Sequence, residues 1–186
     1  LEKGQVLALL SENREEAWVA QMAACALGAV TVSIYPDASG EEVAYILSHS
    51  GAVAILAEDQ EQVDKVLAVR DRCPALARII HIDPRGLWDY GAPGLTPWSA
   101  TQDSPPPAGL EARMDDAQAD DVAVYCYTSG TTGKPKAAML SHAFILDNAY
   151  RLMGSLRIAP GGNYLSYISP AWAAEQFFGV ALPMLA

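Results

Sequence analysis

A stretch of hydroxyl residues, glycines and lysines is the part of this sequence best suited to chemistry. Residues 128–136 read Thr-Ser-Gly-Thr-Thr-Gly-Lys-Pro-Lys and follow directly on a compact apolar run. The two glycines let the backbone take positive φ and approach a ligand closely, and the short hydroxyls and backbone amides supply hydrogen-bond donors. With two lysines nearby, the stretch predicts a loop that wraps the β- and γ-phosphates of a nucleotide. The candidate phosphate-binding residues are Thr128, Ser129, Gly130, Thr131, Thr132, Gly133, Lys134 and Lys136.

The spacing of this stretch excludes two other glycine-rich phosphate loops. A Walker A loop needs Ser or Thr directly after Gly-Lys, whereas Pro135 follows Lys134, and Thr128 stands where its first glycine is required. The kinase pattern Gly-x-Gly-x-x-Gly is also absent. A plain turn between a strand and the next element is the structural alternative. We disfavour it because the run is long and His142 follows six residues after Lys136.

Strands and helices alternate along the first eighty residues and predict the scaffold that holds the loop. Short apolar runs predict strands at 6–10, 30–34, 53–56 and 79–82. Two capping boxes, Asn13 with Glu16 and Ser39 with Glu42, predict the starts of two helices, and a third helix is expected at 60–72. Single helices between strands imply right-handed crossovers. We therefore expect a Rossmann-like, doubly wound α/β fold with a mainly parallel sheet and helices on both faces.

The rest of the chain divides into a connection and a second structured segment. Prolines and glycines crowd residues 84–121, which we interpret as a surface connection with one or two helical turns at 110–117. The elements expected after it are a strand at 122–127, a helix from near Ser141 to about Leu156, a strand at 164–168 and a helix at 173–185 that breaks at Pro183. The predicted organisation is a βα subdomain at 1–83, the connection at 84–121 and a phosphate-loop segment at 122–186, all parts of one larger N-terminal domain.

Composition limits the partners that this chain can have. Lys and Arg number 12 and Asp and Glu 22, which gives a net charge of −10. Binding of nucleic acid over a broad face needs clustered basic side chains, so we expect none. Cys25, Cys73 and Cys126 show no CxxC pair and no disulfide spacing, which suggests free thiols in a reducing compartment and a cytoplasmic location. No apolar run reaches the ~20 residues of a membrane span, and the histidines show no metal-ligand spacing.

The glycine-rich string, together with the tyrosine before it, resembles the phosphate-binding motif of the adenylate-forming superfamily. This superfamily includes acyl-CoA synthetases, adenylation domains of nonribosomal peptide synthetases, and luciferases. Its motif runs Tyr-Thr-Ser-Gly-Thr-Thr-Gly-x-Pro-Lys-Gly, so Lys134 fills the variable place and Lys136 the place of the family's lysine. Ala137 stands where the family has glycine, and alanine is disfavoured there if the position needs positive φ. Residues 28–36 are also similar to the family's N-terminal subdomain, so the resemblance spans nearly the whole chain.

The resemblance implies an enzyme that uses ATP and Mg²⁺ to convert a carboxylic acid into an acyl-adenylate and then transfers the acyl group to CoA. In the long-chain acyl-CoA synthetase branch, the acid is a fatty acid. The resemblance places Trp172 and Glu175 beside the acyl pocket, while the structural alternatives are a core aromatic and a helix cap. The implied partners are the small molecules ATP, the acid and CoA. Peripheral membrane contact and the oligomeric state stay open.

Several parts of the family pattern do not occur in these 186 residues. They are the Tyr-Gly-x-Thr-Glu block, the aspartate that grips the ribose, and the small C-terminal domain with its catalytic lysine. We therefore expect no catalytic residue and no metal ligand within the chain, and we expect that the chain alone does not complete adenylation. Two interpretations remain beside a fatty acyl-CoA synthetase: a ligase for aryl or amino acids, and a noncatalytic nucleotide-binding module.

Overall fold

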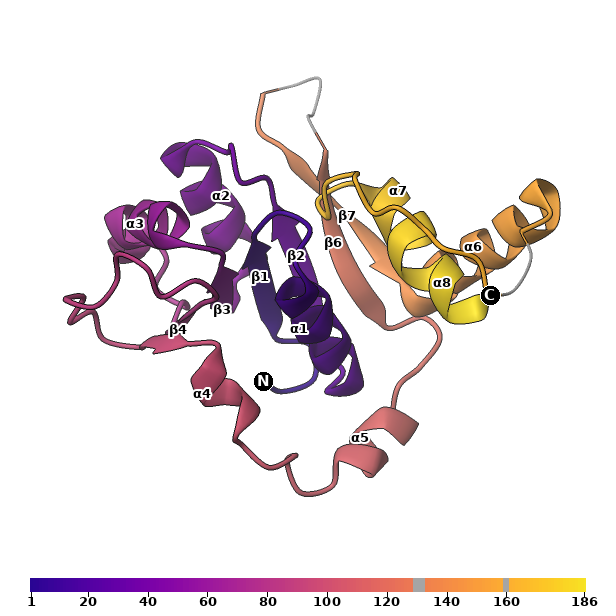
Figure 1. The fold of residues 1–186 in the computed structure, drawn as a ribbon, viewed down its shortest axis with the longest axis horizontal. Coiled ribbons are helices and arrows are strands. Elements are labelled where there is room, and N and C mark those ends of the chain that lie inside the picture. Colours follow the sequence, from indigo (N-terminus) through magenta and orange to yellow (C-terminus); the bar gives the residue numbers. More distant parts are fainter. Residues whose placement is uncertain (129–132, 159–160) are drawn as a thin grey trace.

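The computed structural model describes residues 1–128, 133–158 and 161–186, and within them it contains a seven-stranded sheet (Figure 1). The strand order is β5-β4-β3-β1-β2-β6-β7. The strands are β1 (Val6–Leu10), β2 (Val30–Ile34), β3 (Ala52–Ala57), β4 (Arg78–His81), β5 (Leu95–Pro97), β6 (Val122–Thr128) and β7 (Lys136–Ser141). All neighbouring strands run parallel except β6 and β7, which are antiparallel. The predicted doubly wound, mainly parallel α/β fold is confirmed, with one antiparallel strand at its edge.

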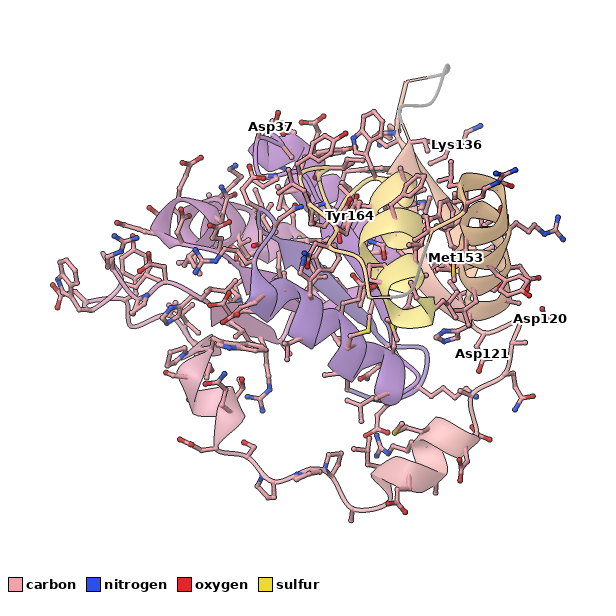
Figure 2. All side chains as sticks on the ribbon, turned by 45° about the vertical axis from the view of Figure 1, so that its right-hand side comes forward. Asp37, Asp120, Asp121, Lys136, Met153 and Tyr164 are labelled. Carbon is pink, nitrogen blue, oxygen red and sulfur yellow. The ribbon has the colours of Figure 1, made fainter. Side chains whose placement is uncertain are left out.

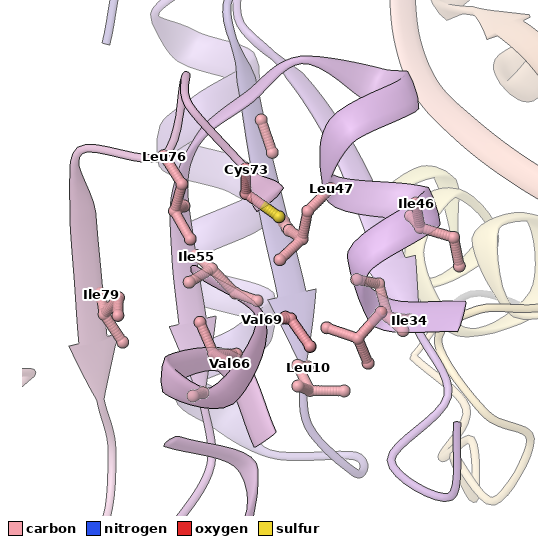
Figure 3. Close-up of a cluster of buried hydrophobic side chains, with 14 of the residues drawn as sticks. Leu10, Ile34, Ile46, Leu47, Ile55, Val66, Val69, Cys73, Leu76 and Ile79 are labelled. Carbon is pink, nitrogen blue, oxygen red and sulfur yellow. The ribbon is translucent and has the colours of Figure 1, made fainter. Parts of the chain in front are cut away.

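The helices α2 (Gly40–Ser50) and α3 (Gln60–Val69) cover one face of the sheet and bury its larger core. Their apolar side chains pack on Leu10, Ile34 and Ile55 of the central strands, each at most 1% exposed (Figure 3). Burying an aliphatic side chain of this size contributes roughly 1.5–3 kcal/mol. The strands β1 and β3 read as continuous apolar runs because helices cover both of their faces.

The opposite face is covered by α1 (Glu15–Ala26), α6 (His142–Leu156) and a C-terminal helical run. The buried side of α1 is made largely of alanines, which face Leu7 and Leu9 of β1. In Figure 1, α1 lies across the sheet on the side away from α2 and α3, and α6 lies next to the C-terminal helices. This arrangement brings the C-terminal helices close to α1, although about 150 residues separate Gln21 from Gln176 in sequence.

The start of α1 differs from the sequence prediction. The helix begins at Glu15, its N-cap position is Arg14, and no side chain caps it. Asn13 instead donates from its amide to Ser166 Oγ at 2.6 Å and to the Ile168 carbonyl at 3.0 Å. The predicted capping box at Asn13 is therefore wrong, because the amide binds partners about 150 residues away in sequence.

The connection at 84–121 holds more regular structure than its composition indicates. Before the connection, a short 3₁₀ helix, η1 (Arg70–Arg72), follows α3. Within the connection, β5 pairs parallel with β4 and widens the sheet. Two short helices follow, α4 (Ser99–Gln102) and α5 (Leu110–Asp115). The helical turns expected at 110–117 are confirmed by α5. The strand β5 was not foreseen, because three residues are too few for a recognisable pattern.

The segment after β6 departs most from the sequence prediction. The strand β7 lies where no element was predicted, and residues 164–168 form no strand. The predicted helix after β7 is confirmed, since Ser141 caps α6 by accepting a hydrogen bond from the Phe144 backbone amide. The C-terminal run consists of α7 (Ala173–Glu175), the π-helical segment η2 (Gln176–Ala181) and α8 (Leu182–Leu185). The run departs from α-helical geometry only in its π-helical segment, which ends at Ala181. Pro183 lies within α8, so the predicted break at Pro183 is wrong.

Candidate functional site

The candidate phosphate-binding residues join the two strands of the β6–β7 hairpin. Thr128 ends β6 and pairs with Lys136, the first residue of β7. The described candidates are Thr128, Gly133, Lys134 and Lys136, and all four are exposed. The remaining candidates, Ser129, Gly130, Thr131 and Thr132, lie outside the described residues. Figure 2 labels Lys136 at this rim of the molecule, where solvent and a dissolved anion can reach it.

Backbone geometry distinguishes two positions beside the lysines. Gly133 has a φ of +113°, which side chains of L-residues rarely adopt, and a Cβ built there would meet no atom within 4 Å. Glycine is thus required at 133 by the backbone and not by crowding. Ala137 lies in extended β7 opposite Tyr127, and Arg157 is the only non-glycine residue with positive φ in the described ranges. Alanine at the family's glycine position therefore causes no backbone strain in this chain.

The two lysines have different surroundings. Lys134 places its Nζ 5.4 Å from the centroid of the Tyr45 ring on α2, a distance typical of a cation–π contact. Lys136 starts β7 and is exposed. His142, the other residue of the motif, is the first residue of α6, and its backbone amide donates to the Asp121 carbonyl at 3.1 Å.

Glu175 is a fully buried carboxylate on α7. It accepts a hydrogen bond from Tyr164 Oη at 2.8 Å and a second, short one from Ser166 Oγ. Its other close neighbour is Gly179 of η2, where an added Cβ would lie 2.1 Å from Glu175 Oε1. Burial, followed by the hydrogen bond to Glu175, raises the pKa of Tyr164 to about 12. The carboxylate is therefore satisfied inside the protein and caps no helix end.

Trp172 precedes α7 and is 56% exposed. An aromatic side chain with this exposure is not part of the core, so the core-aromatic alternative is wrong. Trp172 and Glu175 stand on the same short segment, one facing solvent and the other facing the protein interior. A role of this segment in acid binding stays a prediction.

Two amide side chains from the first half of the molecule hold this segment, and sequence reasoning missed both roles. Besides Asn13, Gln21 of α1 donates from Nε2 to Gln176 Oε1 at 2.6 Å, and Gln176 Nε2 donates to the Pro170 carbonyl at 2.9 Å. Gln21 and Gln176 are at most 2% exposed. No local pattern predicts such a pair, because the two partners are 155 residues apart in sequence.

Comparison with known proteins identifies the class to which this fold belongs. The model of the family described as AMP-binding enzyme matches residues 1–186, so the chain belongs to the AMP-binding enzyme family.

Individual relatives agree with this assignment. The chain is 29% identical over 190 residues to the long-chain-fatty-acid–CoA ligase heimdall of Drosophila melanogaster, covering 98% of this chain and 28% of the relative. It is 34% identical over 143 residues to the long-chain-fatty-acid–CoA ligase FadD15 of Mycobacterium bovis, covering 77% and 23%. The solved acetoacetyl-CoA synthetase of Streptomyces lividans superimposes with a TM-score of 0.78 at 25% identity, covering 96% of this chain and 29% of that one.

The alignments place the chain within the N-terminal region of these enzymes. The chain spans 23–28% of the length of the two curated relatives. No helix in the described ranges is long and apolar enough to cross a membrane.

Proposed function

We propose that this chain is the phosphate-binding part of an AMP-forming acid–CoA ligase that activates a fatty acid. The observation that carries the proposal is the placement of the described candidates in a matched AMP-binding domain: Thr128 and Lys136 pair at the strand ends and are exposed, and Gly133 has positive φ. The names of the curated relatives support the fatty acid as substrate. The acid class and the transfer to CoA are part of the proposal.

In the proposed reaction, a carboxylate oxygen attacks the α-phosphate of ATP, and pyrophosphate leaves. Negative charge grows on the leaving pyrophosphate, so donors already aimed at its oxygens lower the barrier. The part of this chain is to hold the β- and γ-oxygens by the amides and hydroxyls at 128–133 and by the Lys136 ammonium. It activates no nucleophile, because a carboxylate needs no base.

The family also implies Mg²⁺, but the described residues do not offer a site for it. They include no group of three or more His, Cys, Asp or Glu side chains that could hold a metal ion. We therefore derive no step of this chain's contribution through the metal. Its residues bind and orient the phosphate chain.

The charge of Lys136 provides the test. In the complete gene product, Lys136→Ala is expected to lower kcat/KM for ATP–pyrophosphate exchange by about 100-fold, the scale of losing one preorganised donor to a developing anion. Lys134→Ala is expected to cost about fivefold or less, because the Lys134 ammonium lies over an aromatic ring. Equal losses for the two variants would overturn the assignment of Lys136 as the phosphate lysine.

The acid and the extent of the catalytic unit need their own measurements. We expect the 186-residue chain alone to show no ATP–pyrophosphate exchange, whereas the complete gene product shows exchange that depends on a long-chain fatty acid. Exchange that depends only on aryl or amino acids would replace the fatty acid in this proposal. A complete gene product without any exchange, but with ATP affinity, would favour the noncatalytic nucleotide-binding module.

A further inference from the structure

Helix α2 contacts both strand ends that flank the candidate phosphate loop. On the β6 side, His49 Nδ1 and Tyr127 Oη lie 2.7 Å apart and share a hydrogen bond, and the two rings meet edge to face. On the β7 side, Tyr45 Oη donates to the Pro135 carbonyl at 2.9 Å, and Lys134 Nζ lies over the Tyr45 ring. The loop is therefore held where it begins and where it ends by residues one helical turn apart on α2.

The aromatic residues of this contact pack against one another. The Tyr45 and His49 rings stack with centroids 5.2 Å apart, as expected of side chains four positions apart on one helix face. Tyr127 meets Tyr45 edge to face at 6.4 Å. Burial raises the pKa of Tyr127 to about 12, so its hydroxyl keeps its proton throughout the physiological range.

Helix α2, which carries Tyr45 and His49, is fixed at both of its ends and along its buried face. The predicted capping box at Ser39 and Glu42 is confirmed, with both of its hydrogen bonds present. The helix ends at Gly51 in the left-handed conformation. Its inner side chains are buried in the main core. On the exposed side of its first turn, Glu41 accepts two hydrogen bonds from the Arg72 guanidinium, from Nη1 at 2.6 Å and from Nη2 at 2.8 Å.

The surroundings of Lys134 set it apart from a phosphate ligand. A surface hollow of about 550 Å³ lies between α2 and the end of the loop, and Glu41, Glu42, Tyr45 and Lys134 are among its lining residues. Arg72 also lines the hollow and pairs with Glu41, so the charges of the lining balance, and the contact that distinguishes Lys134 is the one with the Tyr45 ring. Lys136 does not line the hollow.

We propose that Tyr45 is a positioning residue for the phosphate loop, and that Lys134 serves the loop by docking on Tyr45 instead of binding the nucleotide. The proposal rests on the function proposed above. Tyr45 touches no nucleotide. It fixes the carbonyl of Pro135 and the ammonium of Lys134, and thereby fixes the direction in which Lys136 leaves the loop. Residues 134–136 are then preorganised before ATP arrives, and an ordered binding segment loses less conformational entropy on binding.

The first test distinguishes the contribution of the Tyr45 ring from that of its hydroxyl, and it uses the complete gene product. Tyr45→Phe removes the hydrogen bond to Pro135 but keeps the ring, and we expect it to raise KM for ATP about threefold. Tyr45→Leu removes both contacts and should raise KM about tenfold, with kcat within twofold of the parent. Tyr90→Phe is the matched control, because the Tyr90 hydroxyl donates to Asp64 on α3, away from the loop. It should leave KM unchanged.

The second test uses the charge on Lys134. Lys134→Arg keeps a cation over the ring and should leave KM for ATP at the parent value, whereas Lys134→Met should raise KM for ATP about threefold. In NMR spectra of the complete gene product, the ε-methylene protons of Lys134 should show the upfield shift of protons above an aromatic ring. The shift should vanish in Tyr45→Leu and persist in Lys136→Ala.

The outcomes distinguish this proposal from the one on which it rests. Loss of exchange in Lys136→Ala together with unchanged KM in Tyr45→Leu would overturn the positioning role and leave the phosphate loop standing. Unchanged exchange in Lys136→Ala would overturn the phosphate loop itself. A fall in kcat with unchanged KM in Tyr45→Phe, or a melting temperature that falls in step with activity across the Tyr45 variants, would show a structural role only and would also overturn the proposal.

Discussion

The first βα units and the segment after the hairpin are held together in different ways. In residues 1–83, buried strands and two amphipathic helices share an apolar core, and most ordering signals lie within each element. In residues 161–186, no helix or strand forms before Ala173, and buried polar side chains add to the apolar contacts of the helical run that follows. Glu175 and Gln176 are both at most 1% exposed. The first region can be recognised from local patterns, whereas the second depends on partners that the first region supplies.

The largest loss of stability should follow from truncating a side chain in the apolar core of the first region. Ile55 is fully buried on β3, so Ile55→Ala loses its transfer energy and leaves a cavity; we expect a loss of about 4 kcal/mol in the free energy of unfolding. Val53→Ala on the same strand, where the side chain is half-buried, should cost about 1 kcal/mol. Urea unfolding of the 186-residue chain measures both. Equal costs would contradict the placement of Ile55 in the main core and of Val53 at its margin.

The second region should be weakened by loss of one carboxylate. Glu175→Ala leaves the hydroxyls of Tyr164 and Ser166 without their acceptor, and we expect a loss of about 3 kcal/mol. Amide exchange should accelerate at 164–168 while β3 stays protected. Glu61→Ala on the surface of α3 is the control, with an expected change within about 0.5 kcal/mol. Uniformly faster exchange would argue against a separate role for polar contacts in this segment.

A matched pair of substitutions compares the two helix starts. Threonine keeps the capping hydroxyl, which accepts from the Glu42 amide and donates to the Glu42 carboxylate, so Ser39→Thr should leave the free energy of unfolding within about 0.3 kcal/mol of the parent. Asn13→Asp replaces the donating amide with a carboxylate that faces the Ser166 hydroxyl and the Ile168 carbonyl, and should cost about 1 kcal/mol. Calorimetry on the two variants decides the comparison. A neutral Asn13→Asp would restore the capping role predicted from sequence.

The smallest effect concerns a local ion pair at the end of the first region. Hydrogen bonds from Arg85 lower the pKa of Asp83 to about 2. Because the folded pKa lies below the unfolded value of about 3.9, the pair adds stability above that pH and loses it as the pH falls toward 2. Arg85 is exposed, so the gain is slight. An NMR titration should show the Asp83 pKa rising toward 3.9 in Arg85→Ala, and an unshifted value would contradict the pairing.

Sequence reasoning succeeded where signal and structure are local. The capping box at Ser39 and Glu42 was readable because its partners are three residues apart and no other group competes for them. The anion-binding role of the lysines and glycine of the hairpin stays a prediction from their residue types. The same reasoning failed at Asn13, where an identical cap pattern gave way to partners on a distant segment. It also failed at 164–168, whose side chains bind Glu175 and Asn13 instead of joining a sheet.

The sequence alone determined the fold class, the order of the first elements, and a family resemblance that the comparisons confirmed. These follow from apolar periodicity and from one motif, both of which lie within short windows of chain. Only the tertiary structure showed the antiparallel strand β7, the hydrogen bonds of Glu175 with Tyr164 and Ser166, and the contact of Lys134 with the Tyr45 ring. The strand β7 depends on the free edge that β6 offers for pairing, and the contacts of Glu175 and Lys134 depend on which surfaces the packed core brings within reach.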